Sequence, residues 1–438
     1  MYRILLLGSG MVVRPLVRYL SAKPDVTLGM AARSLEKAKS IIGGRPIELH
    51  HLDLADSVRL KHILESYDVA ISMLPYTFHV QIAQMCLETR THLVTTSYVS
   101  EEMQALDLPA KDAGLIFLNE IGLDPGIDHM TAMRVIDRVH QEGGKVIAFQ
   151  SACGGLPSPE AITNPLGYKF SWSPRGVVLA ARNAARYLKD GQIVEVPSAK
   201  LFEHCESLHI EGLGTLEMYP NRDALIYRDR YGLSEAKTVF RGTLRNAGWC
   251  SLWRAIVQLG LLDLEPRETR GMTIRSFVLN LLGADKSADP VQVIADRLNT
   301  TPLDFNIYKL GWIGLFEDRP IDDERIAPLD LLVRLLEEKL AFGEHERDMI
   351  VLYHNFIVDL HGQRRIESLL VDFGQVDGDS AMARTVSLPA AIGAYLIATG
   401  QVKERGVIIP VTPELYEPVL QELQSLGIHM NEKVHGLE

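Results

Sequence analysis

The sequence is poor in features that mark several classes of protein. It has only 4 cysteines in 438 residues, at positions 86, 153, 205 and 250, and no Cys-x-x-Cys pair. This spacing predicts neither a disulfide framework nor a metal site. None of the 14 histidines belongs to a His-Glu-x-x-His pattern. No apolar run reaches the ~20 residues that a membrane span needs, so we expect no membrane partner.

Positive charge is also scarce. The formal net charge is −11, and no dense cluster of lysine and arginine occurs. Nucleic-acid phosphates would be repelled without a basic stripe, which excludes nucleic acid as an expected partner. Met1 leads directly into the apolar run Ile4 to Leu7 with no signal-like flank, so we expect a cytoplasmic protein.

The chain has enough apolar residues to bury large cores. At 47% hydrophobic over 438 residues, it predicts two or three domains. The most informative stretch is Asn119 to Met130, which follows the apolar run Leu115 to Leu118 and precedes a helical pattern to His140. It therefore reads as a strand-to-helix turn, which is where open α/β sheets bind ligands.

The first 118 residues carry the pattern of a dinucleotide-binding fold. Arg3 to Leu7 reads as a strand, Gly8-Ser9-Gly10 as the glycine turn, and Leu16 onward as a helix. In the Gly-x-Gly-x-x-Gly motif of such folds the third position is normally Gly or Ala. This chain has Val13 there, so the motif alone is weak evidence. Context strengthens it, because strand-like runs recur at Val26 to Met30, Ile47 to Leu52, Val69 to Met73, Leu93 to Thr95 and Leu115 to Leu118.

The end of the second strand favours NADP over NAD. An NAD site would place an acidic residue there to bind the ribose 2′-hydroxyl, whereas this chain has Arg33 followed by Ser34. A guanidinium can hold a 2′-phosphate in a forked pair, although Arg33 can also be a solvated surface charge. Ser34 can add a hydroxyl or cap the next helix, and Asp53 can reach the adenine or act as a cap.

Two polar turns follow the fourth and fifth strands. Ser72 to His79 is placed on the nicotinamide side of the cleft. In the second turn we assign Ser97 and Tyr98 to the ligand. Ser100, with acidic residues behind it, is assigned to a helix N-cap.

The remaining chain predicts a mixed substrate half and a helical insert. Val146 to Ser151 alternates like a strand, followed by Cys153-Gly154-Gly155, and Tyr168 to Arg175 and Tyr219 to Asp223 read as binding loops. Arg222 and Arg245 are candidate cations for a substrate with several carboxylates, with a surface ion pair as the alternative for each.

The last part of the chain has mostly helical patterns. Helices are predicted at Leu252 to Leu262, Pro290 to Leu298 and Leu329 to Leu340, with an irregular connection at Glu317 to Pro328. A hairpin from Asp348 to Phe373, a long helix at Ala381 to Thr399, a short strand at Val407 to Pro410 and an amphipathic helix at Leu415 to Leu426 are also predicted.

Several longer strings resemble saccharopine reductases, the NADP-dependent, glutamate-forming saccharopine dehydrogenases of the aminoadipate route to lysine. The similarity runs from residue 4 to about residue 255 and is thinner beyond. The strings that carry it are Gly8-Ser9-Gly10, Ile71 to His79, Thr96-Ser97-Tyr98, Asn119 to His129, Cys153 to Pro157, Asn164 to Ser173, Tyr219 to Asp223 and Arg241 to Arg245, with shorter ones at Glu346 to His354 and Ser380 to Ala383.

This resemblance implies an α/β fold with three parts. They are a Rossmann-type NADP-binding domain at 1–128 with about 385–438, a mixed-sheet α/β substrate domain at 129–255 with about 345–384, and a mostly helical insert at 256–344. The implied cofactor contacts are Ser9, Gly10, Met11, Val12, Arg33, Ser34, Asp53, Leu74, Thr96, Ser97, Leu123, Asp124, Pro125 and Ser173. The implied substrate contacts are Ser97, Tyr98, Asp124, Arg222, Thr243, Leu244 and Arg245.

The resemblance also implies the reaction. NADPH would reduce the imine of α-aminoadipate semialdehyde and glutamate to saccharopine, or NADP+ would drive the reverse. Asp124, Tyr98 and Cys153 are the nearby polar candidates for catalysis, with water or the substrate amine as alternative proton carriers. Two other functions stay open, a carboxynorspermidine dehydrogenase-like imine reductase and a non-catalytic NADP-binding regulator. A homodimer is left open as well.

Overall fold

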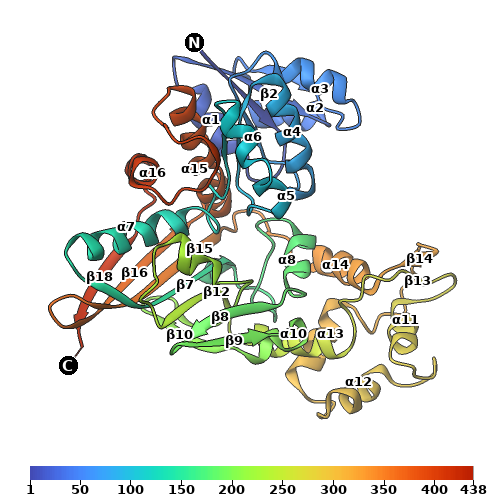
Figure 1. Ribbon diagram of the computed structural model, residues 1–438. Helices are drawn as coiled ribbons and strands as arrows, with labels where there is room; N and C mark the ends of the chain where they lie inside the picture. The colour runs from blue at the N-terminus through green and yellow to red at the C-terminus, as the bar shows by residue number, and fades with distance from the viewer. Residues whose placement is uncertain (438) are drawn as a thin grey trace. The chain divides into compact units, whose positions relative to one another are not determined.

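The computed structural model describes residues 1–437. The chain divides into two compact units, Met1–Val146 with Ile357–Glu438, and Ile147–Phe356. Figure 1 labels their helices and strands.

A parallel seven-stranded sheet forms the centre of the first unit. Its order is β17-β6-β5-β4-β1-β2-β3, and every neighbouring pair is parallel. The strand order reverses between β1 and β4, which is the switch point where such sheets bind dinucleotides. The strands are β1 (Tyr2–Leu7), β2 (Val26–Ala32), β3 (Glu48–His51), β4 (Val69–Ser72), β5 (His92–Thr95), β6 (Ile116–Leu118) and β17 (Gly406–Ile408).

Helices cover both faces of this sheet, as the sequence predicts. On one face, α3, α4 and α6 join a core with the inward residues of the strands, including Leu5 and Phe117. On the other face, α15 packs against α1, β1, β4 and β5. The helices of the first unit are α1 (Arg14–Ser21), α2 (Leu35–Ile42), α3 (Ser57–Leu64), α4 (His79–Thr89), α5 (Glu101–Gln104), α6 (Asp107–Asp112), α7 (Ile127–Gln141), α15 (Ala381–Ala398), α16 (Pro413–Ser425) and the 3-10 turn η1 (Tyr76–Phe78).

The C-terminal segment returns to the nucleotide-binding sheet, as expected. Strand β17 pairs in parallel with β6, and α16 packs against α7 and α15. Helix α15 is long and apolar enough to cross a membrane by length and composition, but 78% of it is buried inside the protein. It therefore serves as a core helix here. The segment ends in β18 (Asn431–Gly436), which pairs antiparallel with β16 (Gln363–Phe373).

The second unit is built on a mixed sheet. Its strands follow the order β10-β11-β12-β7-β15, and β8 joins β12 to β9. Strands β12 and β7 are parallel, whereas β10, β11 and β12 alternate in direction. The strands are β7 (Lys145–Pro157), β8 (Ala185–Lys189), β9 (Gln192–Val196), β10 (Glu206–Ile210), β11 (Gly214–Pro220), β12 (Thr238–Asn246) and β15 (Asp348–Asp359).

The three helices predicted between residues 252 and 340 are present, together with two further helices and a short strand pair. The helices are α10 (Trp249–Gln258), α11 (Ile274–Leu281), α12 (Pro290–Leu298), α13 (Phe305–Ile313) and α14 (Pro328–Lys339), preceded by α8 (Pro174–Ala180), α9 (Ile226–Arg230) and the 3-10 turns η2 (Pro159–Ala161) and η3 (Ser198–Glu203). The predicted irregular connection contains β14 (Arg325–Ile326), which pairs with β13 (Arg267–Glu268). Such a two-residue ribbon is too short to give a periodic signal.

Two boundaries predicted from glycine and proline are wrong. Cys153-Gly154-Gly155 lies inside β7 and not after it. The reason is a close approach of neighbouring strands, because a Cβ on Gly154 would lie 2.6 Å from the carbonyl oxygen of Leu244 on β12. Tyr219 and Pro220 are likewise the last residues of β11, and only the residues that follow form a loop.

Candidate active site

The glycine turn after β1 packs closely against the turn after β4. Gly8 has φ +111°, and a Cβ there would lie 3.2 Å from the carbonyl oxygen of Met73 and 3.4 Å from Leu74 Cδ2. The position therefore requires glycine, and Leu74, a predicted cofactor contact, lies against the turn. Val13 is fully buried at the N-cap of α1. The larger side chain is thus accommodated because the helix starts only at Arg14.

The predicted 2′-phosphate residues follow β2. Arg33 is exposed, and no ion pair joins it to another residue of the described chain 1–437. Ser34 caps α2, because its Oγ accepts a hydrogen bond from the Lys37 amide at 3.3 Å. Asp53 is not the helix cap, since Asp56 accepts from the Arg59 amide in that role. The Asp53 Oδ1 instead accepts from the Ala55 amide at 2.9 Å.

A buried histidine connects the turns after β4 and β5. His79 Nδ1 lies 3.0 Å from Ser72 Oγ, and its Nε2 lies 2.9 Å from both Thr95 Oγ1 and Ser97 Oγ. Burial lowers the pKa of His79 to about 4, so the imidazole is neutral near pH 7. Its hydrogen-bond contact with Ser97 therefore positions the hydroxyl of this predicted ligand contact.

Tyr98 and Asp124 are brought together, as their shared role predicts. The Tyr98 hydroxyl donates to Asp124 Oδ1 at 3.0 Å. Both side chains are only partly buried, so they are accessible to a ligand. A phenol that donates to a carboxylate is a pair that can move a proton.

Hydrogen bonds from buried polar side chains hold the turn that carries Asp124. Glu120 accepts from the Val99 amide at 3.0 Å through Oε1, and its Oε2 lies 2.8 Å from His129 Nε2. Asp128 Oδ1 accepts from the Gly126 amide at 2.6 Å. These bonds fix the segment on which the predicted contacts Leu123, Asp124 and Pro125 lie.

Arg245 occupies a buried aromatic position in the second unit. It is only 5% exposed, and its guanidinium carbon lies 5.0 Å from the ring centre of Tyr168 and 5.2 Å from that of Trp249. Its Nη1 donates to the carbonyl oxygen of Leu244 at 2.8 Å. Within residues 1–437, its Nε and the Trp249 Nε1 are buried donors that no residue accepts from. Such a group of unused donors suits a carboxylate.

The other predicted substrate residues of this unit lie on β12 or in a loop, and the catalytic candidate Cys153 lies on β7. Thr243 is the Cα partner of Cys153. The side chain of Leu244 is fully buried, so only its backbone can face a ligand. Arg222 is exposed, with φ +56°, and its carbonyl oxygen accepts from the Arg186 amide at 2.9 Å.

Ser173, a predicted cofactor contact, has a structural role in this unit. It caps α8, because its Oγ accepts from the Gly176 amide at 3.2 Å. Its hydroxyl proton is still available to a ligand.

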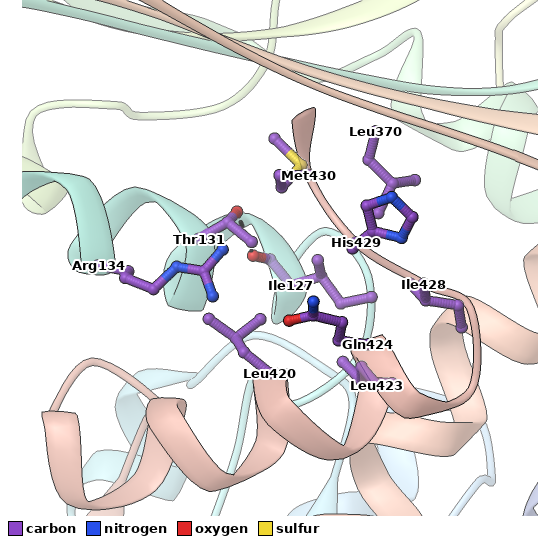
Figure 2. Close-up of a pocket in the computed structure, with 10 residues that line it drawn as sticks. All are labelled: Ile127, Thr131, Arg134, Leu370, Leu420, Leu423, Gln424, Ile428, His429 and Met430. Atoms are coloured by element: carbon purple, nitrogen blue, oxygen red, sulfur yellow. Dashed lines mark hydrogen bonds between the residues drawn. The ribbon is translucent and has the colours of Figure 1, made fainter. Parts of the chain in front are cut away.

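A small cavity lies elsewhere in the first unit. It measures about 70 Å³, and Figure 2 shows side chains of α7, α16, β16 and the segment before β18 around it. Its polar residues are Thr131, Arg134, Gln424 and His429. No predicted site residue lines it, so we do not assign it to the site.

The comparisons with known proteins agree with this architecture. A profile described as the saccharopine dehydrogenase NADP binding domain matches residues 4–118, and one described as the saccharopine dehydrogenase C-terminal domain matches residues 122–428. The chain belongs to the saccharopine dehydrogenase family.

Individual members of the saccharopine dehydrogenase family match over the full length. Saccharopine dehydrogenase [NADP(+), L-glutamate-forming] of Saccharomyces cerevisiae is 40% identical over 98% of both chains. The enzyme of the same name from Schizosaccharomyces pombe is 37% identical over 98% of both. The solved structure of saccharopine dehydrogenase (L-Glu forming) from Saccharomyces cerevisiae has a TM-score of 0.91, with 38% identity and full coverage of both chains.

Three buried residues of the site, His79, Glu120 and His129, are not predicted to have a functional role by the motifs. No periodic pattern reveals such residues. A polar residue just after a buried strand is the available signal, and it does not distinguish a support from a ligand contact.

Proposed function

We propose that the chain is an NADP-dependent saccharopine dehydrogenase of the L-glutamate-forming type. It joins α-aminoadipate semialdehyde and glutamate through an imine and reduces this to saccharopine, or runs the reverse oxidation. The observation that carries the proposal is the similarity over 98% of both chains to enzymes of this name.

The residues of the first unit fit NADP. Gly8 allows the tight turn after β1, no non-neighbouring atom of the described chain lies within 4 Å of a Cβ placed on Gly10, and Arg33 offers an exposed cation for a 2′-phosphate. Ser9, Gly10, Met11 and Val12 would hold the pyrophosphate. The cofactor supplies the hydride, so the main task of the protein is orientation.

Charge recognition would select the substrate. Arg222 and Arg245, with Thr243 and the backbone of Leu244, would bind carboxylates of the imine. A buried guanidinium is costly unless it is paired, and a substrate carboxylate would supply the missing acceptor for Arg245. Because the pairing is charge-assisted, it discriminates strongly against substrates that lack the carboxylate.

Proton transfer would use groups of this chain or water. Formation of the imine requires loss of water from a carbinolamine, and Tyr98 can donate a proton that Asp124 helps to control. Cys153 is a further candidate. It is 7% exposed, and its contribution is tested separately by Cys153→Ala.

The decisive experiment measures NADPH oxidation by the purified full-length chain. Oxidation should require both α-aminoadipate semialdehyde and glutamate, and NADH should be a poorer donor. Turnover only with diamines in place of glutamate would support the carboxynorspermidine dehydrogenase-like alternative. Tight NADPH binding without turnover on either set would support the regulator.

Location and assembly form a separate part of the proposal. We infer that the enzyme works in the cytoplasm, away from membranes, with the acidic net charge and the buried position of α15 as support. A homodimer is one assembly left open by the sequence, and sedimentation equilibrium of the full chain tests it.

A further inference from the structure

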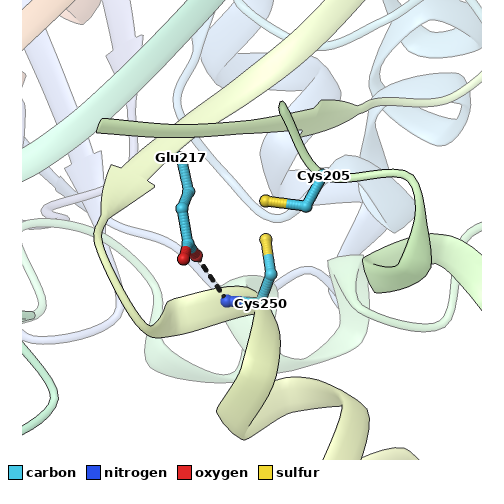
Figure 3. Close-up of side chains that lie close together, drawn as sticks. All are labelled: Cys205, Glu217 and Cys250. Carbon is cyan, nitrogen blue, oxygen red and sulfur yellow. Dashed lines mark hydrogen bonds between the residues drawn. The ribbon is translucent and has the colours of Figure 1, made fainter. Parts of the chain in front are cut away.

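Two cysteines that the sequence separates lie beside a glutamate in the second unit. Figure 3 shows the sulfur atoms of Cys205 and Cys250 near the carboxylate of Glu217. One ligand atom from each of the three lies within 4.8 Å of the others. Cys205 precedes β10, Glu217 lies on β11, and Cys250 lies in the first turn of α10. The sequence spacing gives no sign of this group because each member comes from a different segment.

The carboxylate of Glu217 is held in place by backbone amides. Its Oε1 accepts from the Gly248 amide at 2.8 Å. Its Oε2 accepts from the Cys250 amide at 2.7 Å, which Figure 3 shows as a dashed line. Lys309 Nζ in turn donates to the carbonyl oxygen of Gly248 at 2.9 Å. Each carboxylate oxygen keeps a second lone pair. Metal-binding carboxylates are commonly oriented by hydrogen bonds of this kind.

The spacing is compatible with a metal ion. Both thiols are free in the structure, whereas a disulfide would require an S–S distance of about 2.0 Å. A tetrahedral ion with metal–sulfur bonds of about 2.3 Å keeps its ligand atoms roughly 3.5 to 4 Å apart, which lies within the 4.8 Å limit that the three ligand atoms meet. Two thiolates select zinc and similar soft ions over magnesium or calcium, which prefer oxygen.

We propose that Cys205, Glu217 and Cys250 form a binding site for a thiophilic divalent ion of the zinc class, with water as the fourth ligand. The ion would tie the start of β10 and the start of α10 to β11. Glu217 is also the Cα partner of Arg245 on β12. The site would therefore brace the strand pair that carries the buried arginine, and its existence does not depend on the proposed reaction.

The test measures ion binding by the full-length chain directly. The chain is stripped with a chelator under reducing conditions and titrated with Zn²⁺ in competition with a chromophoric chelator. We expect about one tightly bound ion per chain, and an affinity at least roughly 10-fold weaker in Cys205→Ser and in Cys250→Ser. Cys86→Ala, which removes a buried thiol of the first unit, should bind as the wild type does.

A spectroscopic readout separates this site from adventitious binding. Co²⁺ bound in place of Zn²⁺ should give a sulfur-to-cobalt charge-transfer band that Cys205→Ser abolishes. Cys205 is only half-buried, so this variant carries the test even if Cys250→Ser does not fold. The proposal is overturned if wild type and Cys205→Ser bind equally, if the wild type binds no ion, or if protein purified without oxidant contains a Cys205–Cys250 disulfide.

Discussion

At the scale of single residues, the two arginines assigned to the substrate differ in environment. Arg245 is 5% exposed among aromatic rings, whereas Arg222 is exposed on a loop. Replacing Arg245 would disturb the core as well as binding. Arg222 is therefore the cleaner probe of carboxylate recognition.

Arg222→Ala should raise the KM for the carboxylate substrate. Loss of a charge-assisted hydrogen bond corresponds to a rise of about 10- to 100-fold, with a smaller effect on kcat. Steady-state kinetics with saccharopine as the varied substrate measures it. Arg182→Ala, another exposed arginine of the second unit, should leave the KM unchanged. Equal kinetics for wild type and Arg222→Ala would refute the assignment.

Arg33→Asp should shift cofactor preference from NADP toward NAD. The carboxylate repels a 2′-phosphate and can bind a 2′-hydroxyl. We expect kcat/KM for NADPH to fall roughly 100-fold while that for NADH holds or rises, since two charge-assisted contacts are lost. Lys39→Asp, which makes the same charge change further along α2, is the control and should leave the cofactor preference unchanged. An unchanged preference would place the 2′-phosphate pocket elsewhere.

His79 should make the protein sensitive to moderate acid. Its folded-state pKa of about 4 lies below the ordinary value of 6.5, so protonation favours unfolding. The stabilisation is complete above pH 6.5 and is lost as the pH falls toward 4, by about 3 kcal/mol in total. Urea unfolding across this pH range measures it. His79→Gln should show a flatter pH dependence, and equal slopes in both proteins would contradict the assignment.

Motifs and strand ends locate the glycine turn and the positions of Arg33, Tyr98 and Asp124, whose roles stay predictions. They do not reveal the residues that support these positions. The ring contacts of Arg245 depend on Tyr168 and Trp249. Arg245 lies on a strand, Tyr168 in a loop and Trp249 in a helix, so no single periodic pattern relates the three. Such contacts arise only when the elements pack.

At the scale of elements, the turn between β6 and α7 is tightly closed. The Gly122 amide donates to the carbonyl oxygen of Pro125 at 2.8 Å, and the Ile127 amide donates to that of Gly122 at 2.9 Å. Gly126 completes the turn with φ +144°. The backbone crossing is so close that it leaves no space for a side chain.

Gly126→Ala should destabilise the protein strongly. The new Cβ would lie 2.1 Å from the carbonyl oxygen of Gly122, which predicts a loss of roughly 4 kcal/mol or more. Gly143→Ala is the matched control, because Gly143 has φ +79° but open space around its Cβ, and should cost about 1 kcal/mol. Denaturant unfolding compares the two. Similar losses would show that the backbone angle, and not the contact, governs both positions.

Strand and helix periodicity located most elements correctly, and the failures share a cause. The strand predicted at Val146 to Ser151 continues through Cys153-Gly154-Gly155, and the loop predicted at Tyr219 to Asp223 begins with the last two residues of β11. In the structure, Gly154 allows β12 to approach β7, and Pro220 closes β11 where its missing amide is tolerated. A glycine can end a strand or allow the adjacent strand to approach closely. Which of the two occurs depends on the adjacent strand, and the local sequence does not show which strand that is.

At the scale of the whole molecule, the first unit depends on segments far apart in the chain, whereas the second is the continuous segment Ile147–Phe356. The first unit joins residues 1–146 to residues 357–438. Helix α15 covers one face of the parallel sheet, and β17 forms its outer strand. The family resemblance implies this return, but no pattern predicts the pairing of β18 with β16, because Asn431–Gly436 is exposed throughout and lacks an apolar alternation.

Residues 1–146 expressed alone should not form a stable nucleotide-binding domain. Without α15, the apolar face of β1, β4 and β5 would be open to water, and that loss of burial exceeds the usual margin of stability. Near-UV circular dichroism and denaturant unfolding should show no cooperative transition, whereas the full chain should show one. A fragment that unfolds cooperatively and binds NADPH would contradict this dependence.

The position of β17 beside β6 also bears on biosynthesis. Strand β6 ends at Leu118, but its partner begins only at Gly406. During translation, the edge of β6 that pairs with β17 therefore stays unpaired until nearly the whole polypeptide has been made. A chain released early would present that edge to other chains as a template for pairing, so truncated products should be more prone to aggregation than the finished protein.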